Sequence, residues 1–277
     1  MIKIIDTHCH PYLNKLKNKD DIINNFFSQD GEAMIVIGTN LDSNKQVLEL
    51  TKKHPKIYAT IGIHPCDIEN LDLKETLEIL EKTYIENKDK IVAIGECGLD
   101  YYWMYKDLEK ADLNDFEKEK IIEKQKEFQE IFFKGQIDLA NKLNLPIIIH
   151  NRDSKDDIFE ILVEKNFKNF IFHCYSENLD YAEKLINFSP NCKISFSGIV
   201  TFNNAKQIQE TARNIPIKNI LAETDSPYLT PTPFRGKEEN EPIFTRYVIE
   251  KISELRGEKL ENTANEIYLN SKNFFNI

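Results

Sequence analysis

The sequence opens with Ile2-Lys3-Ile4-Ile5-Asp6-Thr7-His8-Cys9-His10, an apolar run that ends in two histidines. A run of this length and composition is typical of a buried β-strand. Side chains alternate along a strand, so His8 and His10 project to one face with Cα atoms about 6.6 Å apart, while Cys9 projects to the other and packs there. The two imidazoles could hold one divalent cation, or they could be surface histidines at a strand end. The rest of the chain decides between these interpretations.

Seven further apolar runs follow, and segments whose apolar residues recur at helical spacing separate them. We expect strands at residues 32–38, 56–63, 90–96, 145–150, 169–173, 193–197 and 219–225. We expect helices at 18–29, 43–53, 73–86, 155–165, 178–187, 203–213, 243–256 and 262–275, and a long helix that ends near Leu143.

This alternation is typical of a (β/α)₈ barrel, because strands that are apolar on both faces need cover on both. No linker rich in Gly, Pro or Ser divides the sequence. We therefore predict an α/β fold in which residues 1–277 form a single TIM-like (β/α)₈ barrel domain. We also expect Ser43 to cap the helix at 43–53, and the charged stretch from Lys106 to Glu127 to be a surface excursion that leads into the long helix.

Composition argues against several classes of protein. No apolar run approaches the roughly 20 residues that span a bilayer, and charged Lys3 and Asp6 make the N-terminal run unlike a signal peptide. The five cysteines form no C-x-x-C pair, which argues against a thiolate zinc site or a disulfide framework. The formal net charge of −10 disfavours sliding on duplex nucleic acid, so any attraction to a polyanion must be local. We expect a cytoplasmic protein without membrane contact.

Chemically active side chains stand at the ends of the expected strands. In a TIM-like barrel the active site lies at the carboxyl ends of the strands. The residues found there are His8, His10, His64, Glu96, His150, His173 and Asp225. Every histidine except His54 belongs to this set, a concentration that chance does not explain.

These residue types suit a centre of two divalent cations. The histidines of the first strand would hold one ion, His150 and His173 the other, and the two carboxylate oxygens of Glu96 would bridge them. Asp225 would ligate one ion and accept the proton of a metal-activated water. Two cations about 3.5–4 Å apart also clamp the attacking and leaving oxygens of an in-line displacement. The set therefore predicts a hydrolase.

The same residues, in this order, resemble the TatD family of metal-dependent deoxyribonucleases within the amidohydrolase-like superfamily of metal-dependent hydrolases. The motifs that carry the resemblance run from residue 5 to residue 242. They are Ile5-Asp6-Thr7-His8-Cys9-His10, Gly62-Ile63-His64-Pro65, Gly95-Glu96-Cys97-Gly98-Leu99-Asp100-Tyr101, Ile149-His150-Asn151-Arg152-Asp153, Phe172-His173-Cys174-Tyr175-Ser176, Ser195-Phe196-Ser197-Gly198, Glu223-Thr224-Asp225-Ser226-Pro227-Tyr228-Leu229-Thr230-Pro231, Arg235-Gly236 and Asn240-Glu241-Pro242.

The resemblance implies a nuclease that hydrolyses DNA phosphodiester bonds with two divalent ions, Mg²⁺ or Mn²⁺, with Zn²⁺ as a further option. It implies a 3′→5′ exonuclease whose partner is DNA, chiefly single-stranded or at 3′ ends, with a role in DNA degradation or repair. We expect it to act as a monomer. Carried over residue by residue, the metal ligands are His8, His10, Glu96, His150, His173 and Asp225, and the catalytic residues are Asp225, Glu96 and His64.

Residues around the ligands have two interpretations each. His64 resembles the family's substrate-side histidine, placed to contact a phosphate oxygen or the leaving group, but it could also be a structural residue before Pro65. Arg152 could pair with a phosphate or form a salt bridge with Asp153 or another acid. Glu223 shares strand parity with Asp225, and we expect this carboxylate to orient a ligand or water from behind the metals.

The expected rim of the site carries aromatic and cationic residues. Tyr101, Tyr102 and Trp103 are expected on a loop over the site, where Tyr102 could stack on an unpaired base or the rings could simply pack the lid. Arg235 follows a proline-rich turn, and it could reach the cavity mouth as a substrate contact or hold its own loop.

The sequence departs from the family pattern in places that bear on substrate length and strand preference. Pro11-Tyr12 stand where the family has an apolar residue and Asp, so we expect the polar contact of that Asp to be missing. Glu177-Asn178 replace a Gly-Ser pair and add a negative charge near the site.

Two alternatives to a nuclease remain open. The same barrel and metals could hydrolyse cyclic amides or small phosphoesters, because fold and metal ligands alone do not fix the substrate. A non-catalytic metal-binding scaffold would be marked by lost ligands, and this sequence has lost none.

Overall fold

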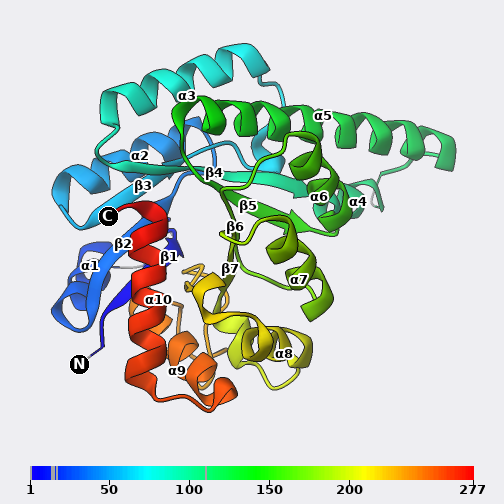
Figure 1. The fold of residues 1–277 in the computed structure, drawn as a ribbon. Helices are drawn as coiled ribbons and strands as arrows, with labels where there is room; N and C mark the ends of the chain where they lie inside the picture. Colours follow the sequence, from blue (N-terminus) through cyan, green and yellow to red (C-terminus); the bar gives the residue numbers. More distant parts are fainter. Residues whose placement is uncertain (1, 14–15, 17, 110) are drawn as a thin grey trace.

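The computed structural model describes residues 2–13, 16, 18–109 and 111–277, and Figure 1 shows its ribbon. The strands are β1 (Ile4–Cys9), β2 (Gly31–Ile37), β3 (Ile57–Ile61), β4 (Ile91–Asp100), β5 (Ile147–Arg152), β6 (Phe170–Phe172), β7 (Lys193–Phe196) and β8 (Ile220–Ala222). The α-helices are α1 (Lys19–Ser28), α2 (Leu41–Lys53), α3 (Leu73–Asn87), α4 (Tyr101–Glu109), α5 (Asp115–Leu143), α6 (Lys155–Glu164), α7 (Leu179–Phe188), α8 (Lys206–Asn214), α9 (Thr245–Arg256) and α10 (Leu260–Phe275). Short 3₁₀ helices are η1 (Pro65–Asp67), η2 (Gly198–Thr201), η3 (Ile217–Asn219) and η4 (Pro242–Phe244).

Within these residues the eight strands form one parallel sheet in the order of the sequence, from β1 to β8. The sheet curls into a nearly closed barrel with the helices around it (Figure 1). Parallel neighbours need a crossover connection, so the chain between two strands packs back on the outside of the sheet. The predicted α/β fold, a TIM-like barrel, is confirmed.

The barrel closes between β1 and the chain that follows β8. Cys9 and Ser226 form an isolated parallel bridge, and the Asp225 N–H donates to the His8 carbonyl oxygen at 2.9 Å. Below this bridge, the fully buried Asp6 carboxylate accepts hydrogen bonds from the Thr224 backbone N–H at 3.0 Å and the Thr224 hydroxyl at 2.6 Å. This buried carboxylate therefore holds the seam where the metal ligands of β1 and Asp225 meet.

Replacing Thr224 with valine is expected to lower the free energy of unfolding by about 1–3 kcal/mol, because a buried Asp6 oxygen loses its donor. The Ser226 N–H, which donates to the Thr224 hydroxyl at 3.0 Å, loses its acceptor as well. Urea unfolding of the metal-free protein measures the change. Thr211→Val is the matched control, since it removes one hydroxyl bond, to the Gln207 carbonyl, within α8. If both variants lose the same free energy of unfolding, the hydrogen bonds at the seam stabilise the fold no more than a bond within a helix does.

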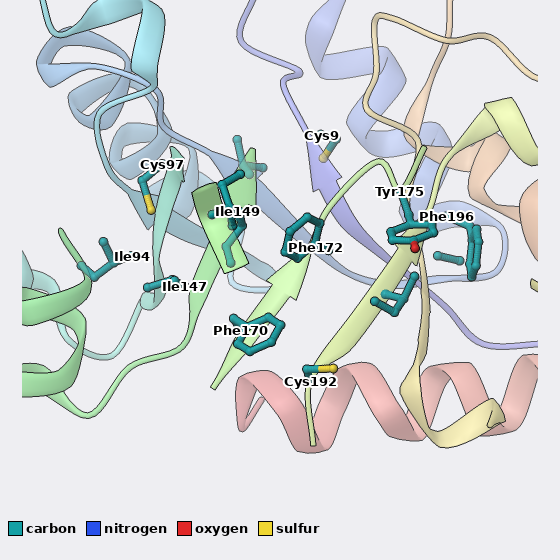
Figure 2. Close-up of a cluster of buried hydrophobic side chains, with 14 of the residues drawn as sticks. Cys9, Ile94, Cys97, Ile147, Ile149, Phe170, Phe172, Tyr175, Cys192 and Phe196 are labelled. Atoms are coloured by element: carbon teal, nitrogen blue, oxygen red, sulfur yellow. The ribbon is translucent and has the colours of Figure 1, made fainter. Parts of the chain in front are cut away.

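Alternate residues of the strands belong to two buried clusters. Phe172 of β6 belongs to a large cluster that extends to the surrounding helices (Figure 2), whereas its neighbour Ile171 belongs to a smaller cluster inside the barrel. His173 lies two residues beyond Ile171, so it faces the barrel interior at the carboxyl end. On β5, Ile148 and His150 repeat this relation. Because side chains alternate along both strands, His150 and His173 both face the barrel interior at its carboxyl end.

The charged stretch from Lys106 to Glu127 is more helical than expected. Its first residues end α4, and α5 begins at Asp115, with Lys110 outside the described residues. The Asn114 side chain accepts from the Glu117 N–H while Glu117 accepts from the Asn114 N–H, a capping box that starts α5 early. The described residues of this stretch lie mostly at the surface and lead into the long helix, as expected, but most of them are helical because Lys and Glu favour helix on an exposed face. In Figure 1, α5 extends well beyond the barrel.

Other boundaries differ from the sequence-based expectation. Asn40 is the N-cap of α2, and Ser43 completes a capping box as the third helical residue, so the helix begins earlier than expected. Strand β4 continues past Glu96 to Asp100, because it pairs with β5 as far as Arg152. The aromatic residues that follow, expected on a loop, form the start of α4.

Among the residues that the structure describes, no helix combines the length and the apolar character that a membrane span needs.

Candidate metal centre

A cavity of about 1180 Å³ opens at the carboxyl ends of the barrel strands. The predicted site residues on its wall are His10, His64, Glu96, Arg152, His150, His173 and Asp225. His8 is fully buried next to this wall. The structure therefore brings together the predicted ligands from five different strands or strand ends.

Glu96 lies at the middle of the cluster. Its Oε1 atom is 2.9 Å from His150 Nδ1 and 2.9 Å from His173 Nε2, and its Oε2 atom is 3.4 Å from His8 Nε2. The two carboxylate oxygens thus face different histidines. Each oxygen of Glu96 could therefore join the histidines beside it in holding a cation.

A second group of ligand atoms adjoins the first. The Nε2 atoms of His8 and His10 are 3.2 Å apart, and Asp225 Oδ1 lies 3.7 Å from the former and 3.5 Å from the latter. Within the described residues, three sets of possible ligands each keep all their ligand atoms within 4.8 Å of one another. The sets are His8 with Glu96 and His173, His8 with His10 and Asp225, and His64 with Glu96 and His150. They share His8 and Glu96, so they describe adjoining positions in one centre.

The donor chemistry at His10 fits a divalent cation. The Tyr12 hydroxyl donates to the Ile37 carbonyl at 2.9 Å, so its oxygen can accept from His10 Nδ1–H, 3.3 Å away. His10 Nε2 then carries a lone pair, and it points at His8 Nε2. Two converging imidazole nitrogens beside a carboxylate are a cation site. At position 12, where the sequence departs from the family pattern, a tyrosine thus makes a polar contact with His10.

Charges in the centre depend on one another. Burial alone would raise the pKa of Glu96, but His173 and the other surrounding imidazoles hold it well below its usual range. Burial likewise opposes protonation of His173, yet Glu96 and Glu223 raise its pKa well above the ordinary value. For His8 burial dominates and lowers the pKa. Glu96 is thus ionised at neutral pH and supplies the negative charge that cations would find there.

Glu223 lies behind His173, in contact with it. Its Oε1 atom accepts from the Cys174 N–H at 2.8 Å and is 3.3 Å from His173 Nδ1. A histidine whose Nδ1 donates to a carboxylate presents Nε2 as the ligand nitrogen. Glu223 therefore directs His173 Nε2 toward Glu96.

His64 makes the structural contact that one of its two interpretations expected, and its other ring nitrogen faces the ligands. Its Nδ1 accepts from the Cys66 N–H at 3.1 Å and so caps η1, while its Nε2 is 3.7 Å from Glu96 Oε1. Burial, and then the charge of His150, lower the pKa of His64 to about 3. A neutral His64 with Nδ1 as acceptor carries its proton on Nε2, the nitrogen that faces the ligands.

The aromatic and cationic residues at the rim are arranged differently from the expectation. Arg152 is exposed, and its guanidinium carbon lies 4.1 Å from the centre of the Tyr102 ring and 5.4 Å from that of Trp103. Tyr102 does not line the cavity, but Trp103, 47% exposed, does. Within the part of the chain that the structure describes, Arg152 has no ion pair with an acid. Arg235 is exposed with its guanidinium over Phe202, and the structure does not bring it to the cavity.

Two residues at the site had no role assigned from the sequence. Tyr12 orients His10, and Asp100 Oδ2 is 3.0 Å from His150 Nε2. Asp100 could have been found from its spacing to Glu96, since every second side chain of a strand lies on the same face. Because β4 reaches residue 100, Glu96, Gly98 and Asp100 all share one face. No comparable signal existed for Tyr12, whose contact depends on the path of the chain after β1.

Known proteins resemble this chain over almost its whole length. The family model described as TatD related DNase matches residues 5–276. The chain is 35% identical to the uncharacterised metal-dependent hydrolase YabD of Bacillus subtilis, over 99% of both chains. It is 31% identical to the uncharacterised metal-dependent hydrolase YcfH of Escherichia coli K12, over 99% of this chain and 96% of that protein.

Two solved structures of TatD proteins have folds similar to that of this chain. The crystal structure of YjjV, a TatD homologue from Escherichia coli K12, superposes with a TM-score of 0.84 at 26% identity, covering 99% of this chain and 98% of that one. A TatD family hydrolase from Entamoeba histolytica has a TM-score of 0.81 at 22% identity over 99% and 98% of the two chains, which is a likeness of fold.

Proposed function

Since this chain belongs to the TatD family of metal-dependent hydrolases, we propose that its substrate is DNA and that it hydrolyses phosphodiester bonds. The observation that carries this proposal is the position of Glu96, with one oxygen facing His150 and His173 and the other facing His8. Cations held by these residues would supply the positive charge that in-line displacement at phosphorus needs.

The ligand set, imidazole and carboxylate without thiolate, suits Mg²⁺ or Mn²⁺, and Zn²⁺ is the other cation to test. When bound, the cations supply positive charge that stabilises the phosphate oxygens and lowers the pKa of the attacking water. Asp225 lies beside both histidines of the first group, and we assign to it the acceptance of the proton from that water.

His64 is assigned to the substrate side of the centre. Its Nε2–H is free of the backbone bond that occupies Nδ1, and its ring forms part of the cavity wall. A neutral N–H at this place can donate to a phosphate oxygen or to the leaving oxygen without adding charge to the centre.

The cavity wall favours an end of a single strand over a long duplex. Among its described residues Arg152 is a cation, whereas Asp67, Glu69 and Asp107 are acids that repel a chain of phosphates. Trp103 offers a partly exposed ring on which an unpaired base can stack. The wall thus supports a single-stranded substrate in our proposal, and from the family resemblance we add to the proposal a 3′→5′ exonuclease polarity and a role in DNA degradation or repair.

Metal-stripped protein, reloaded with Mg²⁺, Mn²⁺ or Zn²⁺ and incubated with 5′-labelled single-stranded DNA, tests the proposal. A ladder that shortens one nucleotide at a time from the 3′ end is the expected result. Parallel reactions contain cyclic amides and small phosphoesters. If the protein hydrolyses a cyclic amide or a small phosphoester but releases no nucleotide from DNA with any of the three metals, the nuclease proposal is wrong. The protein would then belong to the other class of hydrolase.

Replacing Trp103 with alanine is expected to raise KM for single-stranded DNA about 5- to 100-fold, with kcat changed little, because base stacking on an aromatic ring is worth about 1–3 kcal/mol. Steady-state kinetics on a labelled oligonucleotide measure the two constants. Trp103→Phe keeps a flat ring and should retain most of the affinity. An alanine variant with normal KM would show that the ring only packs the rim.

A further inference from the structure

Asp100 contacts a metal ligand without belonging to any of the ligand sets. Its side chain is 1% exposed, and its Oδ2 atom accepts from His150 Nε2, 3.0 Å away. The other ring nitrogen of His150, Nδ1, faces Glu96 Oε1 at 2.9 Å. The two nitrogens of His150 are thus divided between a carboxylate inside the centre and one at its edge.

The position of Asp100 is fixed from several sides. Its backbone N–H donates to Gln129 Oε1 at 2.8 Å, and Gln129 Nε2 donates back to its carbonyl at 3.0 Å, so α5 holds the end of β4. The Asp100 Oδ1 atom accepts from the Trp103 N–H at 3.0 Å, in the first turn of α4. A carboxylate held in this way has little freedom to turn away from His150.

The backbones of β4 and β5 also approach closely beside this contact. At Gly98, a Cβ atom would lie 2.1 Å from the His150 carbonyl oxygen, and φ is +145°, a conformation that side chains disfavour. A glycine here lets β4 approach β5. The strand register pairs Gly98 with His150 and Asp100 with Arg152, which puts the Asp100 carboxylate next to the His150 ring.

We propose that Asp100 is a positioning residue, which fixes the proton of His150 on Nε2 and so leaves Nδ1 as the nitrogen that binds a cation beside Glu96. A metal-binding histidine commonly donates its second N–H to a carboxylate, which sets both tautomer and ring orientation. The inference rests on the proposed role of His150 as a ligand. It does not depend on DNA being the substrate.

Asp100→Asn separates this role from helix capping. Asparagine caps helices about as well as aspartate, so its single oxygen can keep the Trp103 N–H bond. Its amide NH₂ then faces His150 Nε2 and requires a lone pair there, so the ring keeps a proton only on Nδ1, the nitrogen that has to be free to bind a cation. The variant should therefore fold normally with the wrong histidine tautomer.

Long-range ¹H–¹⁵N spectra of the metal-free protein read the tautomer directly, and the chain has only six histidines to resolve. His150→Gln identifies the His150 signals by their loss. We expect His150 to be protonated at Nε2 in the wild type and unprotonated there in Asp100→Asn. Titration with Mn²⁺ should show binding weakened about 10- to 100-fold at one position. Asp100→Glu, which keeps the carboxylate, should restore part of the affinity.

Asp107→Asn is the matched control, because Asp107 is an exposed acid of α4 on the same cavity wall and loses the same charge. It should leave the His150 signals and Mn²⁺ affinity unchanged. Wild-type His150 signals and Mn²⁺ affinity in Asp100→Asn would overturn the proposal. Complete loss of one Mn²⁺ with unchanged His150 signals would overturn it too, because Asp100 would then be a ligand itself. A protein that shows the expected spectra but cleaves no DNA contradicts only the proposed function.

Discussion

Asp225→Asn is expected to lower kcat for DNA cleavage by about 10²–10⁴-fold, the usual contribution of a positioned general base. Asparagine has nearly the shape of aspartate, but its amide cannot accept a proton from water. The backbone of Asp225 is held independently of the side chain, because its N–H donates to the His8 carbonyl and its own carbonyl accepts from the Tyr228 N–H. The fold should therefore survive the substitution.

Single-turnover cleavage at saturating metal measures the chemical step without product release. Glu238→Gln is the control, an exposed acid in the loop that follows Asp225 and away from the cavity wall. It removes a comparable charge and should cleave at the wild-type rate. An Asp225→Asn enzyme within about threefold of that rate would refute Asp225 as the proton acceptor, since a lost base costs far more.

The parts of the fold that the sequence predicted are those in which one simple pattern governs the structure. In β6, Phe172 faces outward, and Ile171 and His173 face inward, as strict alternation requires. The same alternation holds for His150 on β5. Because parallel strands end at one rim of a barrel, residues far apart in sequence could be placed together before any contact was known.

The end of β4 and the start of α4 were predicted wrongly because tertiary contacts, and not the local sequence pattern, determine the backbone conformation there. Nothing in Gly98-Leu99-Asp100 continues the apolar run of β4, yet pairing with β5 extends the strand through these residues. The aromatic start of α4 has weak helix propensity, and the Asp100 side chain that accepts from the Trp103 N–H becomes visible as a cap only in the structure. The contact of Asp100 with His150 was hidden by the same error.

Contacts behind the ligands were predictable only where strand parity governs them. Glu223 was expected behind a ligand, because the sequence predicted a strand at 219–225 on which it shares a face with Asp225. In the structure β8 ends at Ala222, yet the Glu223 carboxylate still lies against His173. Tyr12 could not, since it lies beyond the end of β1, and its bond to the Ile37 carbonyl depends on how the chain turns over β2. The sequence suggested only that the contact of an Asp is lost at position 12, and gave no sign that Tyr12 would contact His10.

Glu96→Gln is expected to have the largest effect on the metal centre. Glutamine matches glutamate in shape but removes the one negative charge that lies within 3.4 Å of nitrogens from His8, His150 and His173. Its amide NH₂ would also direct protons at ligand nitrogens. We expect affinity for Mn²⁺ to fall at least about 100-fold, the upper range for loss of an outer contact, because here a bridging ligand itself is lost.

Elemental analysis after dialysis and Mn²⁺ titration measure occupancy and affinity, and DNA cleavage should fall with them. Glu69→Gln, an exposed acid on the cavity wall without a ligand contact, is the control. Retention of wild-type metal content by Glu96→Gln would remove Glu96 from the centre. Loss of metal in both variants would instead point to general charge around the cavity.

Stability of the metal-free protein gives a second readout of the same residue. The pKa of His173 is raised in the fold by the neighbouring carboxylates, against the effect of burial, so its contribution is present below the ordinary value of 6.5 and is lost as pH rises above it. The pKa of Glu96 is lowered, and its contribution is lost as pH falls below about 4.5. In urea unfolding without metal, the stability of the wild type in excess of Glu96→Gln should therefore be largest between these values, because the effects of burial on other groups are common to both proteins. Glu96→Gln removes the carboxylate that both contributions involve. A difference between the two proteins that does not vary with pH would mean that Glu96 and His173 do not interact as their 2.9 Å separation requires.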